Sequence, residues 1–178
     1  MCKRSNTPVL GFLKVFVPGL ISSLGHGAAA QTKTEYPAPG VYAGSVQSTN
    51  GVMTTTMRAK MSIVMSGKFT IETGGLFPHM YECEFVPLKQ LQEFLEEDQA
   101  KGINPALSIP KGPGVGFIGS EVLSGKGGTP VKGTIVRTPT GVRISFQIEG
   151  FDMSATGEPS IDDKYGVQEE VHGDLQRR

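Results

Sequence analysis

The dipeptide Asn50-Gly51 constrains the fold of this chain more than any other feature. Asn-Gly between two alternating apolar and polar runs is the strongest short-range signal of a β-hairpin. Residues 41–48 precede the pair and residues 52–65 follow it, and both runs alternate in this way. We therefore predict a two-residue turn with positive φ at Asn50 and Gly51, and an antiparallel pair of strands on either side of it.

That turn fixes which residues share a face of the predicted hairpin. Val46 would lie opposite Thr55, and Gly44 opposite Met57, with both pairs on an apolar face. The other face is polar and carries Thr54, Thr56, Arg58, Lys60 and Ser62. A half-buried antiparallel pair requires such a division between its two faces.

The same reasoning extends the sheet toward the C-terminus. A three-residue loop at Ser66-Gly67-Lys68 would place Ile63 opposite Ile71, and residues 80–86 alternate again. The turn Pro139-Thr140-Gly141 predicts a second hairpin, between residues 131–138 and 142–149, with Val136 opposite Ile144. A change of parity after Gly150, where Phe151, Met153 and Ala155 continue the apolar set, predicts a β-bulge at Glu149-Gly150.

One segment has the pattern of an α-helix. Residues 88–101 carry an apolar stripe of Leu88, Leu91 and Leu95, Pro87 stands at the predicted start, and Gly102 follows the predicted end. Proline at the start and glycine after the end are typical helix boundaries.

The predicted hairpins and the single helix together give the fold class. It is mainly β, an antiparallel meander of six to eight strands that forms a small barrel with one helix. A β-sandwich is the alternative.

The chain divides into four segments. Residues 1–30 have a positively charged start, a short apolar run and the sequence Ala28-Ala29-Ala30, which together predict a cleaved signal peptide and export to the periplasm or the outside of the cell. Residues 31–40 are a predicted flexible lead-in, 41–157 a single β-rich domain, and 158–178 a polar, disordered tail. After cleavage no stable insertion into a membrane is expected, because no later run is long and apolar enough.

Composition excludes several classes of protein. The whole chain has no net charge, and loss of Lys3, Arg4 and Lys14 with the signal would leave it mildly acidic. A nucleic-acid-binding protein would instead show a basic patch. Cleavage would also leave Cys83 as the single cysteine, which excludes an intramolecular disulfide and favours a buried thiol.

Sequence motifs for nucleotide binding, metal binding or catalysis are weak in this chain. The glycines at 114, 116 and 119 match G-x-G-x-x-G, but prolines precede them and no helix is predicted after them, so no nucleotide site and no cofactor are expected. His79 and Cys83 lie about 13 Å apart on a regular strand, too far to share a metal ion. We find no catalytic constellation and no metal site, so an enzyme ranks last among the functions considered.

A stripe of methionines suggests a binding function instead. Met53, Met57, Met61 and Met65 recur every four residues and share the predicted apolar face. Methionine packs as core but also makes adaptable apolar surfaces that accept varied ligands. We expect candidate ligand-binding residues at Tyr42, Met53, Met57, Met61, Met65 and Phe69.

Two functions follow as expectations. The first is an exported protein that binds a small apolar molecule in the barrel interior. The second is an exported interaction module, such as an inhibitor or an envelope-assembly factor, that binds a protein partner through its loops or a sheet edge. A cavity inside the barrel would favour the first function, and a filled core with an exposed apolar edge would favour the second.

Overall fold

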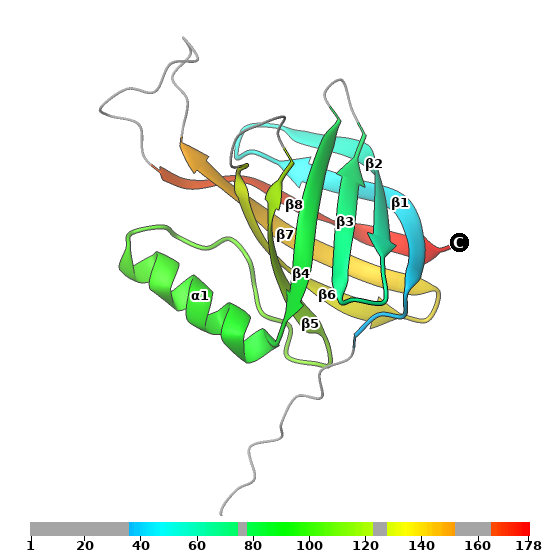
Figure 1. Ribbon diagram of the computed structural model, residues 1–178. Helices are drawn as coiled ribbons and strands as arrows, with labels where there is room; N and C mark the ends of the chain where they lie inside the picture. Colours follow the sequence, from blue (N-terminus) through cyan, green and yellow to red (C-terminus); the bar gives the residue numbers. More distant parts are fainter. Residues whose placement is uncertain (1–35, 75–77, 123–127, 152–164) are drawn as a thin grey trace, which may run out of the picture. The chain divides into compact units, whose positions relative to one another are not determined.

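A computed structural model describes residues 36–74, 78–122, 128–151 and 165–178. Over these residues the chain forms a closed antiparallel barrel in meander order, which confirms the predicted fold class and excludes the sandwich (Figure 1). Its strands are β1 (Gly40–Thr49), β2 (Thr54–Ile63), β3 (Lys68–Thr73), β4 (His79–Val86), β5 (Val115–Glu121), β6 (Pro130–Thr138), β7 (Gly141–Phe151) and β8 (Tyr165–Arg177). The helix α1 (Leu88–Ala100) connects β4 to β5 and lies against the outside of the barrel.

Alternation along the strands fills the barrel interior with apolar side chains. Aromatic rings span this interior in contact: Phe69 and Phe117 lie 5.3 Å apart between ring centroids, and Phe117 and Phe146 lie 6.1 Å apart. Gly133 makes room for them, since a Cβ there would lie 2.3 Å from Cζ of Phe117. The middle of the barrel is therefore a packed core.

A second, smaller core holds α1 against the barrel wall. Leu91 and Leu95 are buried there with Val86 of β4, as the helical pattern predicted. The helix approaches β5 closely because Gly116 has no side chain: a Cβ there would lie 2.9 Å from Cβ of Leu91. The glycine run that resembled a nucleotide motif therefore lies mostly in strand β5, where Gly116 allows the close packing of α1.

Two hairpin registers differ from the prediction by two residues. Val46 pairs with Met57, and Ile63 pairs with Phe69. In the first turn, the side-chain oxygen of Asn50 accepts hydrogen bonds from two backbone N–H groups, and only Gly51 has positive φ, at 80°. Because side chains alternate with a period of two, a shift of two residues leaves the side chains that remain within the strands on their predicted faces.

The β6–β7 register differs by one residue, which changes the face of β6. Ile135, not Val136, lies opposite Ile144, because the connection is a two-residue turn with Gly141 already in β7. The inward face of β6 is thus Val131, Gly133 and Ile135. A register shift lies between Ile148 and Glu149, one residue before the predicted bulge, and the extra residue is Gln168 of β8, because Ile148 pairs with Glu169 and Glu149 with Val167.

The prediction of a disordered tail over 158–178 is wrong for residues 165–177. These residues form β8, which pairs with both β1 and β7 and closes the barrel. Val171 and Leu175 point inward and are buried, and two such residues are enough for a strand whose neighbours supply the rest of the core. The β-rich domain therefore extends past residue 157.

The predicted signal peptide at residues 1–30 and residues 31–35 of the predicted lead-in lie outside the described residues. Within the described parts of the chain, no helix has the length and apolar character that crossing a membrane requires.

Candidate functional site

The structure separates the six predicted ligand-binding residues. Tyr42, Met61 and Phe69 are buried in the barrel core, and Met57 is partly buried against it. The expectation that all four methionines face the interior is wrong for Met53 and Met65, which are 63% and 93% exposed. Both fall in the hairpin connections, because the registers of those hairpins are shifted by two residues.

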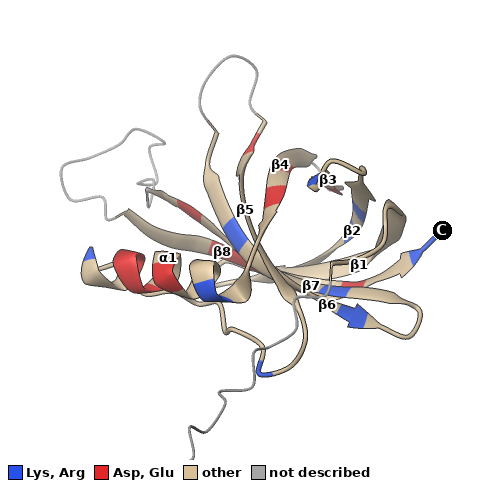
Figure 2. Cartoon of the chain, turned by 60° about the horizontal axis from the view of Figure 1, so that its bottom comes forward, with Lys and Arg blue, Asp and Glu red and all other residues tan. Residues whose placement is uncertain are grey.

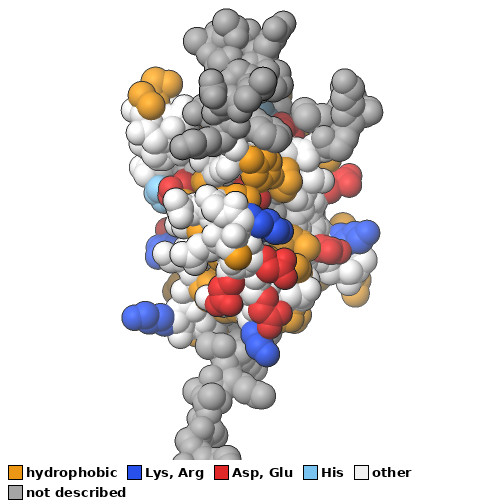
Figure 3. Space-filling model, turned by 90° about the vertical axis from the view of Figure 1, so that its left-hand side faces the viewer, with side chains coloured by type: hydrophobic (Ala, Val, Ile, Leu, Met, Phe, Trp, Pro, Cys, Tyr) orange, Lys and Arg blue, Asp and Glu red, His pale blue; other side chains and the backbone are white. Residues whose placement is uncertain are grey.

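A cleft beside the helix, outside the barrel, offers space for a ligand. It has a volume of about 710 Å³, within the usual range for small-molecule sites. Its floor is the outer surface of β3–β6, and Phe94 of α1 lines it on the helix side. We call this hollow the helix cleft. Figure 3, which faces α1, shows hydrophobic side chains exposed beside acidic ones on this side of the molecule.

The lining of the helix cleft is mixed. Its apolar side chains are Val64, Phe94, Ile118 and Pro130, and hydroxyls come from Ser62, Thr70 and Ser120. Its charged side chains are Lys68, Glu82, Glu84 and Lys132. Apolar walls with a few polar groups are typical of a binding site for a small organic molecule.

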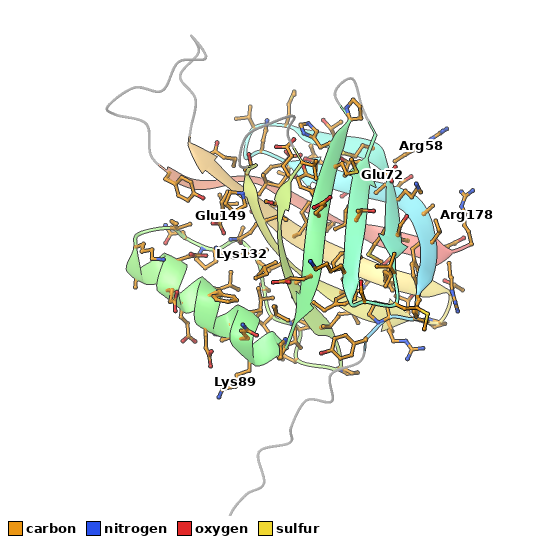
Figure 4. The ribbon with its side chains drawn as sticks, in the orientation of Figure 1. Arg58, Glu72, Lys89, Lys132, Glu149 and Arg178 are labelled. Carbon is orange, nitrogen blue, oxygen red and sulfur yellow. The ribbon has the colours of Figure 1, made fainter. Side chains whose placement is uncertain are left out.

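Lys132 connects this cleft to a buried ionic cluster beneath α1. Its ammonium donates to Asp98 of the helix, and to both carboxylate oxygens of Glu149 at 2.8 and 3.0 Å. Gln147 donates to Glu149 at 2.9 Å and accepts from the backbone N–H of Ala106 and Leu107, both at 3.1 Å. Figure 4 shows Lys132 and Glu149 between the helix and the sheet. The cluster ties α1 and the following segment to the barrel.

The charge state of this cluster limits its chemistry. Burial by itself would lower the pKa of Lys132, but its hydrogen bonds to Asp98 and Glu149 outweigh burial and raise that pKa above the usual value for lysine. Lys132 is therefore protonated at neutral pH and is not a nucleophile. It can donate a hydrogen bond or hold a negative charge.

A second polar group gathers at one end of the barrel interior. The side chains that point inward there are Ser48, Thr73, His79, Tyr81, Glu121 and Glu169, which we call the barrel-end cluster. They satisfy one another: Ser48 donates to Glu169, and His79 contacts Glu121. This layer ends the apolar core with hydrogen-bonded groups.

Burial perturbs two groups of the barrel-end cluster. Burial, followed by the nearby Glu121 and Glu169, raises the pKa of the Tyr81 phenol above its ordinary value. Burial also raises the pKa of Glu169, which His79 partly offsets. Among the described residues, no group of three or more His, Cys, Asp and Glu side chains is placed to hold a metal ion.

Cys83 lies inside the barrel as a free, buried thiol. Burial, with a smaller effect of Glu82, raises its pKa to about 12. Such a thiol is protonated at neutral pH and is a poor nucleophile. The sequence-based expectation of a buried structural cysteine is confirmed.

Comparisons with protein-family models, with curated proteins and with solved structures find no match for this chain. The candidate site is therefore defined by its own residues.

The sequence did not predict the helix cleft or the cluster of Lys132, Asp98 and Glu149, because these residues come from α1, β6 and β7, far apart in the chain. Gln147 and Glu149 occupy the polar positions of a regularly alternating strand, so nothing in the local pattern marked them as buried.

Proposed function

We propose that this chain is an exported binding protein that holds a small molecule with a largely apolar body in the helix cleft. The observation that carries the proposal is the contrast between a barrel interior filled by aromatic rings and an open cleft of about 710 Å³ beside α1. The small apolar ligand expected from the sequence is kept, and its place moves from the interior to the outer wall.

The residues of the cleft support this kind of ligand. Phe94 offers an aromatic face, and Ile118 and Val64 offer aliphatic surface. Hydroxyl groups on the floor, such as that of Thr70, can orient a polar substituent of the ligand. Lys132 at the edge of the cleft is protonated, and its ammonium is already bound to Asp98 and Glu149.

The alternative function is an interaction module that binds a protein partner through its loops or through a sheet edge, and the closed barrel does not offer the sheet edge. Strand pairing is closed from β1 round to β8, so the described strands leave no free edge to which a partner strand could add. A protein partner would have to use the loops or the outer surfaces.

Filling the cleft tests the proposal. Thr70 points outward on β3 and lines the cleft, so Thr70→Trp would occupy part of its volume. Thr56 points outward on β2 away from the cleft, and Thr56→Trp is the matched control, since aromatic residues suit strand positions. The probe is N-phenyl-1-naphthylamine, a neutral apolar fluorophore.

We expect saturable binding of this probe by the wild type and by Thr56→Trp, and loss of binding in Thr70→Trp. Both variants should unfold at the temperature of the wild type within a few degrees, which shows that the fold is intact. Equal binding by all three proteins, or no binding by the wild type, would contradict a ligand site in the helix cleft.

A further inference from the structure

A second groove lies on the barrel wall away from α1. It has a volume of about 990 Å³ and runs along the outer surface of β1–β4. One end reaches Val41 at the start of β1, where the backbone N–H of Arg178 donates to the carbonyl of Val41 at 2.9 Å. The other end reaches Pro78 and Met80, at the start of β4. The groove is therefore elongated, and we call it the arginine groove.

Cationic side chains dominate the polar lining of this groove. Arg58, Lys60 and Arg178 line it, and Glu72 is the one acidic side chain among the described residues that do so. Lys60 already binds Glu72 at 2.9 Å. Among the described residues neither Arg58 nor Arg178 has an ion-pair partner. Figure 4 shows both arginines on the side of the barrel opposite α1.

The floor between the two arginines is unusually open. Ala43, Gly44 and Ser45 of β1 present only small side chains there. A ligand can therefore lie close to the strand backbone, with Arg58 beside Ser45 at one end of this floor and Arg178 beside Val41 at the other. Guanidinium groups bind carboxylates with paired, charge-assisted hydrogen bonds.

The far end of the same groove is apolar. Met80 and Val122 are 41% and 42% exposed, and the backbone N–H of Val122 donates to the carbonyl of Met80 at 2.7 Å, so the two residues lie side by side. Pro78 continues this apolar surface. An elongated groove with cationic residues along its length and an apolar end is complementary to a chain molecule that carries one negative charge.

We propose that the arginine groove binds an amphiphilic carboxylate of the fatty-acid type. The carboxylate lies against Arg58, the arginine that the following experiment removes, and the alkyl chain lies along Met80, Val122 and Pro78. This site is distinct from the helix cleft, and the proposal stands independently of the function proposed above.

Isothermal titration calorimetry with decanoate, below its micelle concentration, tests the proposal. Decyltrimethylammonium tests the sign of the charge, and acetate and inorganic phosphate test the need for the alkyl chain. Arg58→Gln removes one guanidinium from the groove. The matched control is Arg137→Gln, since Arg137 is an exposed arginine on β6 outside the groove. Thr70→Trp separates this groove from the helix cleft.

We expect decanoate to bind wild type, Arg137→Gln and Thr70→Trp alike, and to bind Arg58→Gln about tenfold more weakly, as for loss of one charge-assisted hydrogen bond. Several results would overturn the proposal: equal binding of decyltrimethylammonium, equal binding of acetate or phosphate, no binding of decanoate, or no effect of Arg58→Gln. Loss of decanoate binding in Thr70→Trp would also overturn it, and would instead support a ligand site in the helix cleft.

Discussion

Lys132 should be the charged residue on which the stability of the α1–barrel contact depends most. Its ammonium is the basic group between two carboxylates that are almost fully buried, with side-chain exposures of 8% for Asp98 and 3% for Glu149. Removing one partner of a buried ion pair typically costs about 3–5 kcal/mol, because the other partner stays buried and uncompensated. Lys132 itself keeps 15% exposure, so we expect Lys132→Met to lower the free energy of unfolding by about 3 kcal/mol.

Urea denaturation at pH 7, followed by circular dichroism, measures this change. The matched control is Lys89→Met: Lys89 is also a lysine with a carboxylate neighbour, but it lies 3.8 Å from Glu93 and is 90% exposed. Exposed pairs of this kind contribute less than about 1 kcal/mol. Figure 2 shows the acidic residues along α1, the helix that carries Asp98 and Glu93.

The pH dependence of stability follows from the raised pKa of Lys132. A basic group whose pKa is higher in the folded than in the unfolded protein stabilises the fold fully below its unfolded pKa, here about 10.5. That contribution is lost as the pH rises through the folded value. The stability difference between wild type and Lys132→Met should therefore be constant near neutral pH and should shrink above about pH 10.5.

A double variant separates charge from packing. Lys132→Met combined with Glu149→Gln removes one of the two uncompensated carboxylates, so it should be more stable than Lys132→Met alone. A loss below about 1 kcal/mol in Lys132→Met, or the same loss in Lys89→Met, would refute the role assigned to the buried cluster.

Three further predictions concern the barrel. Gly133→Val should cost at least about 2 kcal/mol, because its side chain would collide with the ring of Phe117, and a fall in melting temperature of several degrees would show it. Met61→Ala should cost about 2–5 kcal/mol and Met65→Ala less than about 0.5 kcal/mol in urea titrations, and equal costs would contradict the assigned register. Cys83 should resist Ellman's reagent at pH 8 in the folded protein and react fully in urea, whereas rapid reaction of the native protein would exclude a buried thiol with a pKa of about 12.

The mainly β fold and the helix were predictable because both rest on local periodicity. Alternation at residues 41–48 and the stripe Leu88, Leu91, Leu95 set the faces of β1 and α1, and shifts of two residues in register did not disturb those faces. The one-residue shift at the β6–β7 turn was not predictable in this way. Pro139-Thr140-Gly141 suits a two-residue and a three-residue connection, and only packing of the aromatic core selects Gly133 as the inward residue.

Local sequence patterns did not predict strand β8, the helix cleft or the buried cluster of Lys132, and the reason differs from that for the β6–β7 turn. Residues 165–177 carry few large apolar side chains, and what orders them is pairing with β1 and β7 on both sides. Likewise Lys132, Asp98 and Glu149 form a cluster only because α1 folds back over β6 and β7. Local patterns predict elements, whereas both sites depend on which elements become neighbours.

Native mass spectrometry of the protein purified from its own host tests the proposed binding function most directly. We predict a small ligand on the wild type and on Thr56→Trp that is absent from Thr70→Trp, whereas a carboxylate held in the arginine groove would stay on all three proteins. Retention by Thr70→Trp of every ligand that the wild type carries, or no ligand on the wild type, would contradict binding in the helix cleft.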